Sequence, residues 1–218
     1  MVLYEDQEIL VVNKPAGMLV HASGKPGQIN LVDHPRQVKD DPELRPVHRL
    51  DRQTSGVLLL ARSAAAARLY GKLFAAGIPR KTYLAEVRGK FNQASGLIDK
   101  ALGKDEASEV AVRRRTVDQG ERAVTRFQLL QVHDHSSFVL LWPQTGRRHQ
   151  LRVHMADLNH PIINDPIYDL GDTYYLALRY SEIIAAPMHL HAAQLEITLT
   201  DGRTQNFSAP LPSYLNPI

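Results

Sequence analysis

The chain has 218 residues, no cysteine and a formal net charge of +3. The lack of cysteine excludes disulfides, thiolate chemistry and cysteine-ligated zinc or iron–sulfur sites, and it favours a reducing cytoplasm. No apolar run approaches the roughly 20 residues that a membrane-spanning helix needs, and the N-terminus MVLYEDQEIL lacks the layout of a signal peptide. The mild basic excess is compatible with an RNA partner and is also ordinary for a soluble enzyme. We therefore expect a cytoplasmic protein without membrane contact.

The N-terminal half of the chain predicts a strand, an irregular stretch and a helix. Residues 8–13 contain four consecutive apolar residues that end at a Lys-Pro pair, which predicts a short strand followed by a turn in NKPAG, residues 13–17. Residues 21–47 carry four prolines and predict a loop or a weak helix. Residues 63–77 predict the clearest helix, because a serine can cap its start, apolar residues recur at 3.6-residue spacing and a glycine ends it.

The second half of the chain predicts an antiparallel series of strands. Alternating or apolar stretches indicate strands at residues 80–87, 109–115, 123–132, 138–142 and 188–200. Residues 94–108 are polar and predict a loop or a short edge hairpin, whereas residues 148–158 have helical spacing. We therefore expect an α+β fold with a mixed, mainly antiparallel sheet flanked by helices. We also expect residues 1–218 to form a single domain.

The stretch HRLDRQTSG, residues 48–56, places charged side chains at the mouth of a predicted buried strand. Asp51 follows Arg49 by two residues, and a small hydroxyl-rich turn then leads into the apolar run VLLLA. Loops at strand ends often hold the groups that act on ligands, because rigid backbone fixes side chains that solvent can reach. A carboxylate there can be a nucleophile, a base or half of an ion pair, and the local pattern does not choose among them.

Other chemistries find little support in the sequence. The ten histidines include three closely spaced pairs, but a zinc site needs three or four ligands, and isolated His pairs occur often by chance. There is no G-x-S-x-G elbow of a serine hydrolase, no second carboxylate in a recognisable glycosidase site and no P-loop or dinucleotide fingerprint. We therefore predict no metal site.

The stretch at residues 48–56 resembles the signature H-R-L-D-x-x-T-S-G of the RluA family of pseudouridine synthases at every specified position. Four further segments are similar to family blocks in the expected order: NKPAG at 13–17, RKTYLAEVRG at 80–89, TGRRHQLRVH at 145–154 and LHA at 190–192. The chain is most similar to the short form of the family, without an S4-type N-terminal module. It departs from the family in the irregular stretch before the signature and at Asn164 and Asp169, where glycines are usual.

This resemblance implies three catalytic residues. Asp51 would be the catalytic carboxylate, which either attacks covalently or removes a sugar proton. Arg147 would pair with this aspartate and hold it ionised and oriented. Tyr83 would lie against the target uracil, although its place in a predicted strand would by itself assign it to the core.

The resemblance also implies how a uridine would be bound. The target nucleotide would be flipped out of its stack, with Arg49 filling the vacated space and holding phosphate. Val153 and Leu190 would contribute to a flat apolar slot for the base, and His48 and Thr54 join the binding residues through their positions in the signature. No cofactor is expected, because uracil is itself the leaving group and the returning nucleophile.

The function implied is isomerisation of a uridine to pseudouridine in tRNA or rRNA, at a single-stranded loop, by a monomeric enzyme. The alternative is a catalytically silent RNA-binding module of the same fold. Asp51 favours catalysis, because a module that only binds has no reason to hold a costly carboxylate in a closed pocket. The triple arginine at residues 113–115 is either a solvated strand edge or a phosphate contact.

Overall fold

The computed structural model describes residues 2–20, 31, 43–180 and 185–217. The predicted loop or weak helix over 21–47 therefore lies largely outside the described residues. The chain divides into two compact units, each built from two stretches of sequence: unit 1 is Met1–Lys81 with His191–Leu211, and unit 2 is Thr82–Leu190 with Pro212–Ile218. The grouping of residues 1–218 into one domain stays a prediction.

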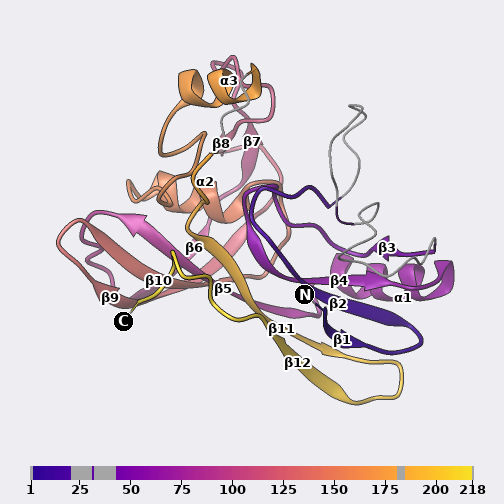
Figure 1. The fold of residues 1–218 in the computed structure, drawn as a ribbon. Helices are drawn as coiled ribbons and strands as arrows, with labels where there is room; N and C mark the ends of the chain where they lie inside the picture. Colours follow the sequence, from indigo (N-terminus) through magenta and orange to yellow (C-terminus); the bar gives the residue numbers. More distant parts are fainter. Residues whose placement is uncertain (1, 21–30, 32–42, 181–184, 218) are drawn as a thin grey trace. The chain divides into compact units, whose positions relative to one another are not determined.

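The strands of unit 1 follow the order β1-β2-β4-β11, with β12 paired to β11 and β3 paired to β4 (Figure 1). All of these pairs are antiparallel except β4 with β11, which is parallel. The strands are β1 (Val2–Glu5), β2 (Ile9–Lys14), β3 (Arg45–Pro46), β4 (Ser55–Ala61), β11 (Leu190–Thr198) and β12 (Thr204–Ser208). The first residue of β11 belongs to unit 2. The strands predicted over 8–13 and 188–200 are thus confirmed.

Strand β4 is the centre of unit 1, because every one of its seven residues is buried. Helix α1 (Ala64–Ala75) contacts β4 (Figure 1). Its first turn is capped by Ser63, whose hydroxyl accepts a hydrogen bond from the Ala66 N–H at 3.1 Å, as predicted. The helix, β2, β4, β11 and β12 share one apolar core that includes Ile9, Leu59, Tyr70, Leu195 and Phe207.

Unit 2 contains an antiparallel series in the order β5-β10-β9-β6 and a separate antiparallel pair β7-β8 (Figure 1). Helix α2 contacts β8, β9 and β10. The elements are β5 (Arg80–Arg88), β6 (Ser95–Asp99), β7 (Leu102–Lys104), β8 (Arg114–Thr116), β9 (Val124–Val132), β10 (Ser136–Pro143), α2 (Gln150–Asp157) and α3 (Asp172–Tyr180). The first two residues of β5 belong to unit 1.

The α+β class and the mixed, mainly antiparallel sheet are confirmed, whereas two local predictions are wrong. Residues 109–115 do not form one strand, because the Arg113 N–H donates to the Val110 carbonyl at 2.8 Å in a turn and β8 begins only afterwards. Residues 94–108 are neither a loop nor an edge hairpin, since they contain β6, which pairs with β9, and β7, which pairs with β8. Helix α3 was not predicted. No helix in the described part of the chain is long and apolar enough to span a membrane.

Candidate active site

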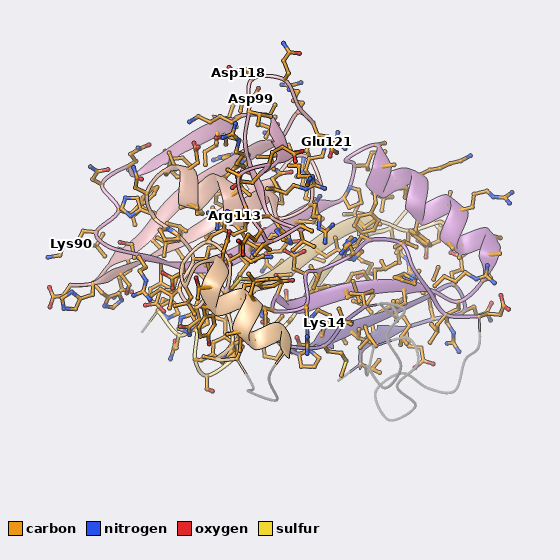
Figure 2. The ribbon with its side chains drawn as sticks, turned by 90° about the horizontal axis from the view of Figure 1, so that it is seen from above. Lys14, Lys90, Asp99, Arg113, Asp118 and Glu121 are labelled. Atoms are coloured by element: carbon orange, nitrogen blue, oxygen red, sulfur yellow. The ribbon has the colours of Figure 1, made fainter. Side chains whose placement is uncertain are left out.

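The signature loop of unit 1 is held by a buried lysine from the neighbouring NKPAG turn. The Lys14 side chain is 0% exposed, and its Nζ donates to the carbonyl oxygens of Pro15 at 3.0 Å, Met18 at 2.9 Å and Arg52 at 3.1 Å (Figure 2). Burial lowers the pKa of Lys14 to about 7, although the charge of Asp51 acts in the opposite direction. The amino group of Lys14 therefore joins the turn after β2 to the residue that follows Asp51.

Two further hydrogen bonds join the same two segments. The Gly17 N–H donates to the Arg52 carbonyl at 2.8 Å, and the Arg52 Nε donates to the Gly17 carbonyl at 2.9 Å. Gly17 has a φ of 85°, a left-handed conformation that a glycine adopts without strain. The NKPAG turn, which sequence alone treats as a strand ending, is thus a structural support of the Asp51 loop.

Asp51 lies in a tight turn between this support and β4. Its carbonyl accepts a hydrogen bond from the Thr54 N–H at 3.1 Å, and its side chain is partly exposed. Arg49 is exposed, whereas Thr54 is only 2% exposed. The loop therefore presents an aspartate and an arginine on a backbone that is fixed from both sides.

His48 is engaged inside unit 1. Its Nε2 accepts a hydrogen bond from the Leu59 N–H at 3.0 Å, and its ring stacks on Phe74 with centroids 4.3 Å apart and planes 12° apart. Burial, together with the positive charge of Lys81, lowers the pKa of His48 to about 3, so the ring is neutral. These contacts give His48 a packing role, and its predicted role in substrate binding stays a prediction.

The last residues of the signature contact the LHA block at residues 190–192. Ser55 and His191 are partners in the parallel β4–β11 register, and the Ser55 Oγ lies 2.8 Å from the His191 Nδ1. Gly56 pairs with Ala192, and a Cβ built on Gly56 would lie 2.2 Å from the Ala192 carbonyl oxygen. Only glycine fits this approach, and its φ of 112° adds to the requirement.

The remaining predicted site residues belong to unit 2. Tyr83 lies on β5 opposite Leu141 of β10 and is 9% exposed. Val153 is 3% exposed and packs in a small cluster with Leu102 and Ala123. Leu190, the first residue of β11, is also 3% exposed. The apolar slot predicted from these side chains, and the roles of Tyr83 and Val153 within it, stay predictions.

The TGRRHQLRVH segment is organised by the buried amide of Gln150. Its Oε1 accepts hydrogen bonds from the Thr145 hydroxyl at 2.7 Å and from the Arg147 N–H at 3.0 Å, and its Nε2 donates to the Val124 carbonyl and the Thr125 hydroxyl at 2.9 Å each. This single side chain holds the start of α2 against the start of β9. It thereby fixes the backbone of Arg147.

The Arg147 guanidinium is half exposed and lies beside another turn of unit 2. Its Nε donates to the Arg122 carbonyl at 3.1 Å, and a terminal nitrogen lies 3.6 Å from a carboxylate oxygen of Glu121. Figure 2 shows Glu121 at the same end of the unit as Asp99 and Asp118. An exposed pair of this kind contributes little to stability, so it leaves the guanidinium available for other ligands. The pairing of Arg147 with Asp51 joins residues of different units and stays a prediction.

Sequence reasoning missed the buried ion pair that anchors α2. Arg152 donates to both carboxylate oxygens of Asp165, at 2.7 and 2.8 Å, and the two side chains are 6% and 0% exposed. Asp165 also accepts from the main-chain N–H groups of Ile167 and Tyr168. The Asp-Pro pair at 165–166 was a possible signal for a structured turn, but nothing local indicated its partner thirteen residues earlier.

The two departures from the family pattern are accommodated in one turn. Asn164 adopts a φ of 59°, the left-handed region that asparagine tolerates better than most residues. The Asp169 carboxylate accepts from the Asn164 N–H at 2.9 Å and forms a fork with the Arg88 guanidinium. Asparagine and aspartate therefore take the places of the two glycines through their own hydrogen bonds.

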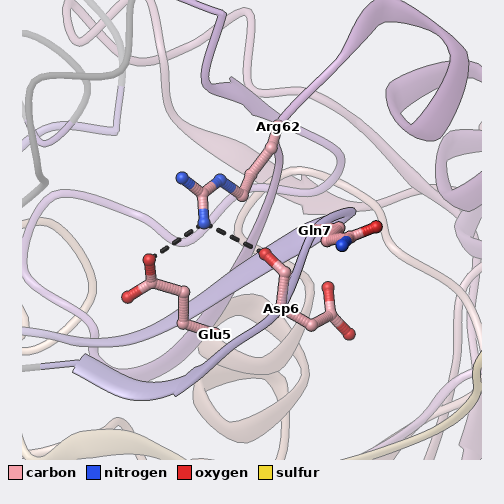
Figure 3. A pocket seen from close by; sticks show the side chains of 4 residues that line it. All are labelled: Glu5, Asp6, Gln7 and Arg62. Carbon is pink, nitrogen blue, oxygen red and sulfur yellow. Dashed lines mark hydrogen bonds and ion pairs between the residues drawn. The ribbon is translucent and has the colours of Figure 1, made fainter.

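A charged hollow of unit 1 stabilises the fold. The hollow in Figure 3 is lined by Glu5, Asp6, Gln7 and Arg62, and the Arg62 guanidinium there donates to the Glu5 carboxylate at 2.9 Å and the Asp6 carbonyl at 3.0 Å. These bonds join the β1–β2 turn to the end of β4. Within the described residues, no group of three side chains is arranged to hold a metal ion.

Of the triple arginine, Arg113 is committed to internal contacts (Figure 2). Its guanidinium binds the carboxylates of Asp105 at 3.0 Å and Asp172 at 2.6 Å. Arg115 is exposed, and Arg114 is partly exposed. Arg113 therefore serves internal contacts, and the two alternatives, a solvated edge and a phosphate contact, stay open for Arg114 and Arg115.

This fold is that of pseudouridine synthase domains. The structure matches the human RNA pseudouridylate synthase domain containing 1 with a TM-score of 0.77 and 29% identity, covering 97% of this chain and 83% of that chain. It also matches the human RNA pseudouridylate synthase domain containing 4 with a TM-score of 0.74 and 28% identity, covering 98% and 89%. The class of protein is therefore defined by fold as well as by motif.

Sequence comparison identifies the family. The family model described as RNA pseudouridylate synthase matches residues 8–157. The dual-specificity RNA pseudouridine synthase RluA of Yersinia pestis is 40% identical over 199 residues, which are 91% of this chain and 92% of that protein. The ribosomal large subunit pseudouridine synthase D of Borreliella burgdorferi is 32% identical over 220 residues, 97% of this chain but 65% of that longer protein. The chain belongs to the RNA pseudouridylate synthase family, with the short RluA proteins among its relatives, and this makes it an isomerase that acts on RNA.

Proposed function

We propose that this chain converts one uridine to pseudouridine in a single-stranded loop of tRNA or rRNA, with Asp51 as the catalytic group. The observation that carries the proposal is the support of the Asp51 loop by Lys14, Gly17 and Arg52. Catalysis requires a reacting group to be held close to its productive position, and burying a lysine amino group with three carbonyl acceptors costs more than an ordinary surface loop requires.

The reaction conserves every atom of the nucleotide. The C1′–N1 bond breaks and the base leaves as a uracil anion, which turns so that C5 faces C1′. A C1′–C5 bond then forms, the hydrogen on C5 is lost as a proton, and N1 takes up a proton. Asp51 either attacks C1′ as the base leaves, and this ester bond breaks when C5 attacks C1′, or it removes a proton from the ribose as the base leaves and returns this proton to the ribose when the C1′–C5 bond forms. Neither route needs an oxidant, a reductant or a cofactor.

The other residues take supporting roles in this proposal. Arg147 pairs with the Asp51 carboxylate, which favours its ionised form and fixes its direction. The ring of Tyr83 stacks on the flipped base, and Leu190 and Val153 extend the apolar slot. Arg49, which is exposed on the same loop as Asp51, is suited to hold a phosphate and to fill the space that the flipped base leaves.

Two considerations support the proposed RNA class, the names of the relatives and the access of the enzyme to the uridine. The Yersinia relative is a dual-specificity RNA pseudouridine synthase and the Borreliella relative acts on the large ribosomal subunit. A uridine in a loop can be flipped at lower cost than one in a duplex, which favours loops of tRNA or rRNA. We further propose that residues 1–218 act as one catalytic domain, as a monomer in the cytoplasm.

The test is Asp51→Asn, which changes the charge of the side chain with little change in its size. The substrate is RNA labelled with tritium at uridine C5, extracted from cells that lack the gene, because pseudouridine formation releases this tritium to water. We expect release to stop while RNA binding and the melting temperature stay near those of the wild type. Asp201→Asn, which removes an exposed carboxylate paired with Arg203, serves as the control and should release tritium normally.

Two outcomes would contradict the proposal. Full tritium release by Asp51→Asn would remove the aspartate from catalysis. RNA binding by the wild-type protein without release from any RNA would favour the alternative, a binding module of the same fold. Arg147→Ala should also lose most of the activity, and normal turnover by this variant would exclude Arg147 from the site.

A further inference from the structure

The Tyr168 side chain connects three parts of unit 2 at the start of α2. Its hydroxyl oxygen accepts a hydrogen bond from the Arg114 N–H at 2.9 Å and lies 3.0 Å from the Nδ1 of His149. Its ring is flanked by two guanidinium groups, with the Arg113 Cζ 5.4 Å and the Arg152 Cζ 5.1 Å from its centroid. Tyr168 therefore links β8, the residue before α2 and the first turn of α2.

The Tyr168 hydroxyl can hold both partners at once. A main-chain N–H can only donate, so the phenol oxygen is the acceptor toward Arg114. A phenol oxygen that accepts one hydrogen bond can still donate its proton or accept a second bond, so its contact with the His149 Nδ1 fits either tautomer of the imidazole.

His149 needs such a restraint because its backbone is strained. Its φ of 57° lies in the left-handed region, which costs a non-glycine residue about 1–2 kcal/mol. The residue is only 9% exposed, and no side-chain hydrogen bond caps the helix from this position. A residue keeps such a conformation where its surroundings hold it there.

The left-handed turn at His149 sets the direction of the chain at Arg147. The turn is closed on both sides, since the Gln150 N–H donates to the Arg147 carbonyl at 3.1 Å and the Arg147 N–H donates to the Gln150 Oε1 at 3.0 Å. A shift of the His149 backbone would lengthen or break these two hydrogen bonds. The guanidinium of Arg147 would then leave its present position beside the Arg122 carbonyl.

We propose that the Tyr168 hydroxyl is a positioning group for Arg147, acting through the left-handed conformation of His149. This inference rests on the proposed function for the role of Arg147 in the reaction. It adds a residue that lies outside the TGRRHQLRVH segment.

A role in packing alone would give Tyr168 different properties. Its ring packs against the small cluster of Leu102, Ala123 and Val153. Tyr168→Phe keeps this ring and removes only the hydroxyl. If the ring serves packing alone, this variant should keep nearly all of its kcat. Tyr70→Phe is the matched control, because the Tyr70 hydroxyl donates to the Glu8 carboxylate at 3.2 Å in unit 1 and neither residue belongs to a motif segment.

The first experiment measures tritium release from the labelled RNA under single-turnover and steady-state conditions. We expect Tyr168→Phe to lower kcat by about tenfold, the effect of losing roughly one hydrogen bond in the transition state, with KM and the melting temperature unchanged. Tyr70→Phe should keep the wild-type kcat. A wild-type kcat for Tyr168→Phe, or an equal loss in the control, would overturn the inference.

The second experiment tests whether Tyr168 acts through Arg147. In an Arg147→Lys background the guanidinium fork is already absent, so adding Tyr168→Phe should lower kcat no further. A full additional loss would show that the hydroxyl acts by another route and would overturn the inference.

A third readout is independent of activity. Hydrogen exchange at the amides of residues 147–150 should be faster in Tyr168→Phe than in the wild type, and unchanged in Tyr70→Phe. Unchanged exchange in Tyr168→Phe would overturn the inference even in an active enzyme. Faster exchange together with normal activity of Arg147→Ala would instead support the positioning contact and refute the catalytic role proposed for Arg147.

Discussion

The Arg152–Asp165 ion pair offers a sharp test of how unit 2 holds the Arg147 turn. Asp165→Asn keeps the size of the side chain and the Oδ1 that accepts from Ile167 and Tyr168. It removes the negative charge and turns an amide N–H₂ toward the Arg152 Nε, now 2.7 Å from a carboxylate oxygen. The guanidinium, with a side chain only 6% exposed, would stay buried and lose the charge of Asp165. Breaking a buried pair from one side costs about 3–5 kcal/mol.

The assay is urea unfolding followed by the fluorescence of Trp142, the single tryptophan, which lies on β10 of the same unit. We expect the free energy of unfolding to fall by about 3–5 kcal/mol in Asp165→Asn. The control is Asp99→Asn, which breaks an exposed pair with Arg122 and should leave the midpoint unchanged. If Asp165→Asn unfolds at the same urea concentration as this control, the pair does not anchor α2 and the reasoning is refuted.

Two further predictions concern unit 1. Gly56→Ala should destabilise the protein by roughly 2–4 kcal/mol in thermal unfolding, because its Cβ would lie 2.2 Å from the Ala192 carbonyl oxygen at a φ of 112°. The control Gly17→Ala has open space around its Cβ and should lose only about 1 kcal/mol of stability. Equal losses in the two variants would contradict this account. Lys14 has a pKa of about 7 against 10.5 in the unfolded chain, so between these pH values only the unfolded chain holds the extra proton. The stability of the wild type relative to Lys14→Met should therefore rise by about 1 kcal/mol per pH unit in urea titrations at pH 7 and 9, and a flat or falling difference would contradict it.

The parts of the fold that could be predicted from sequence are those whose signal is local. The apolar run of β4 and the capped helix α1 with its 3.6-residue spacing both appear in one short window of sequence. Strands β7 and β8 have three residues each, too few for alternation to be visible. Helix α3 was missed because the residues that hold its start come from a distant segment. Ser108 and Arg113 both donate to the carboxylate of Asp172, the first residue of the helix.

The candidate site shows the same division between local and long-range information. The motifs located the loops correctly, since motifs are contiguous. They did not reveal that Ser55 forms a hydrogen bond with His191, 136 residues away, or that Lys14 donates to the carbonyl of Arg52, 38 residues away. Bonds of this kind depend on which strands become neighbours, and strand pairing between distant segments is not written in any single window.

The same distinction bears on what the motif residues do. In HRLDRQTSG, His48 bonds a strand amide, Ser55 bonds His191 and Gly56 admits the Ala192 carbonyl. Each of these contacts fixes backbone, and together they leave Asp51 as a partly exposed charge on a rigid turn.

The TGRRHQLRVH segment has the same construction, with Gln150, Arg152 and His154 buried and Arg147 half exposed. Loops at strand and helix ends have little apolar surface to bury, so polar hubs must hold them, and a polar hub is stable only when its hydrogen bonds are satisfied. A substitution in these hubs should therefore lower activity by loosening Asp51 or Arg147.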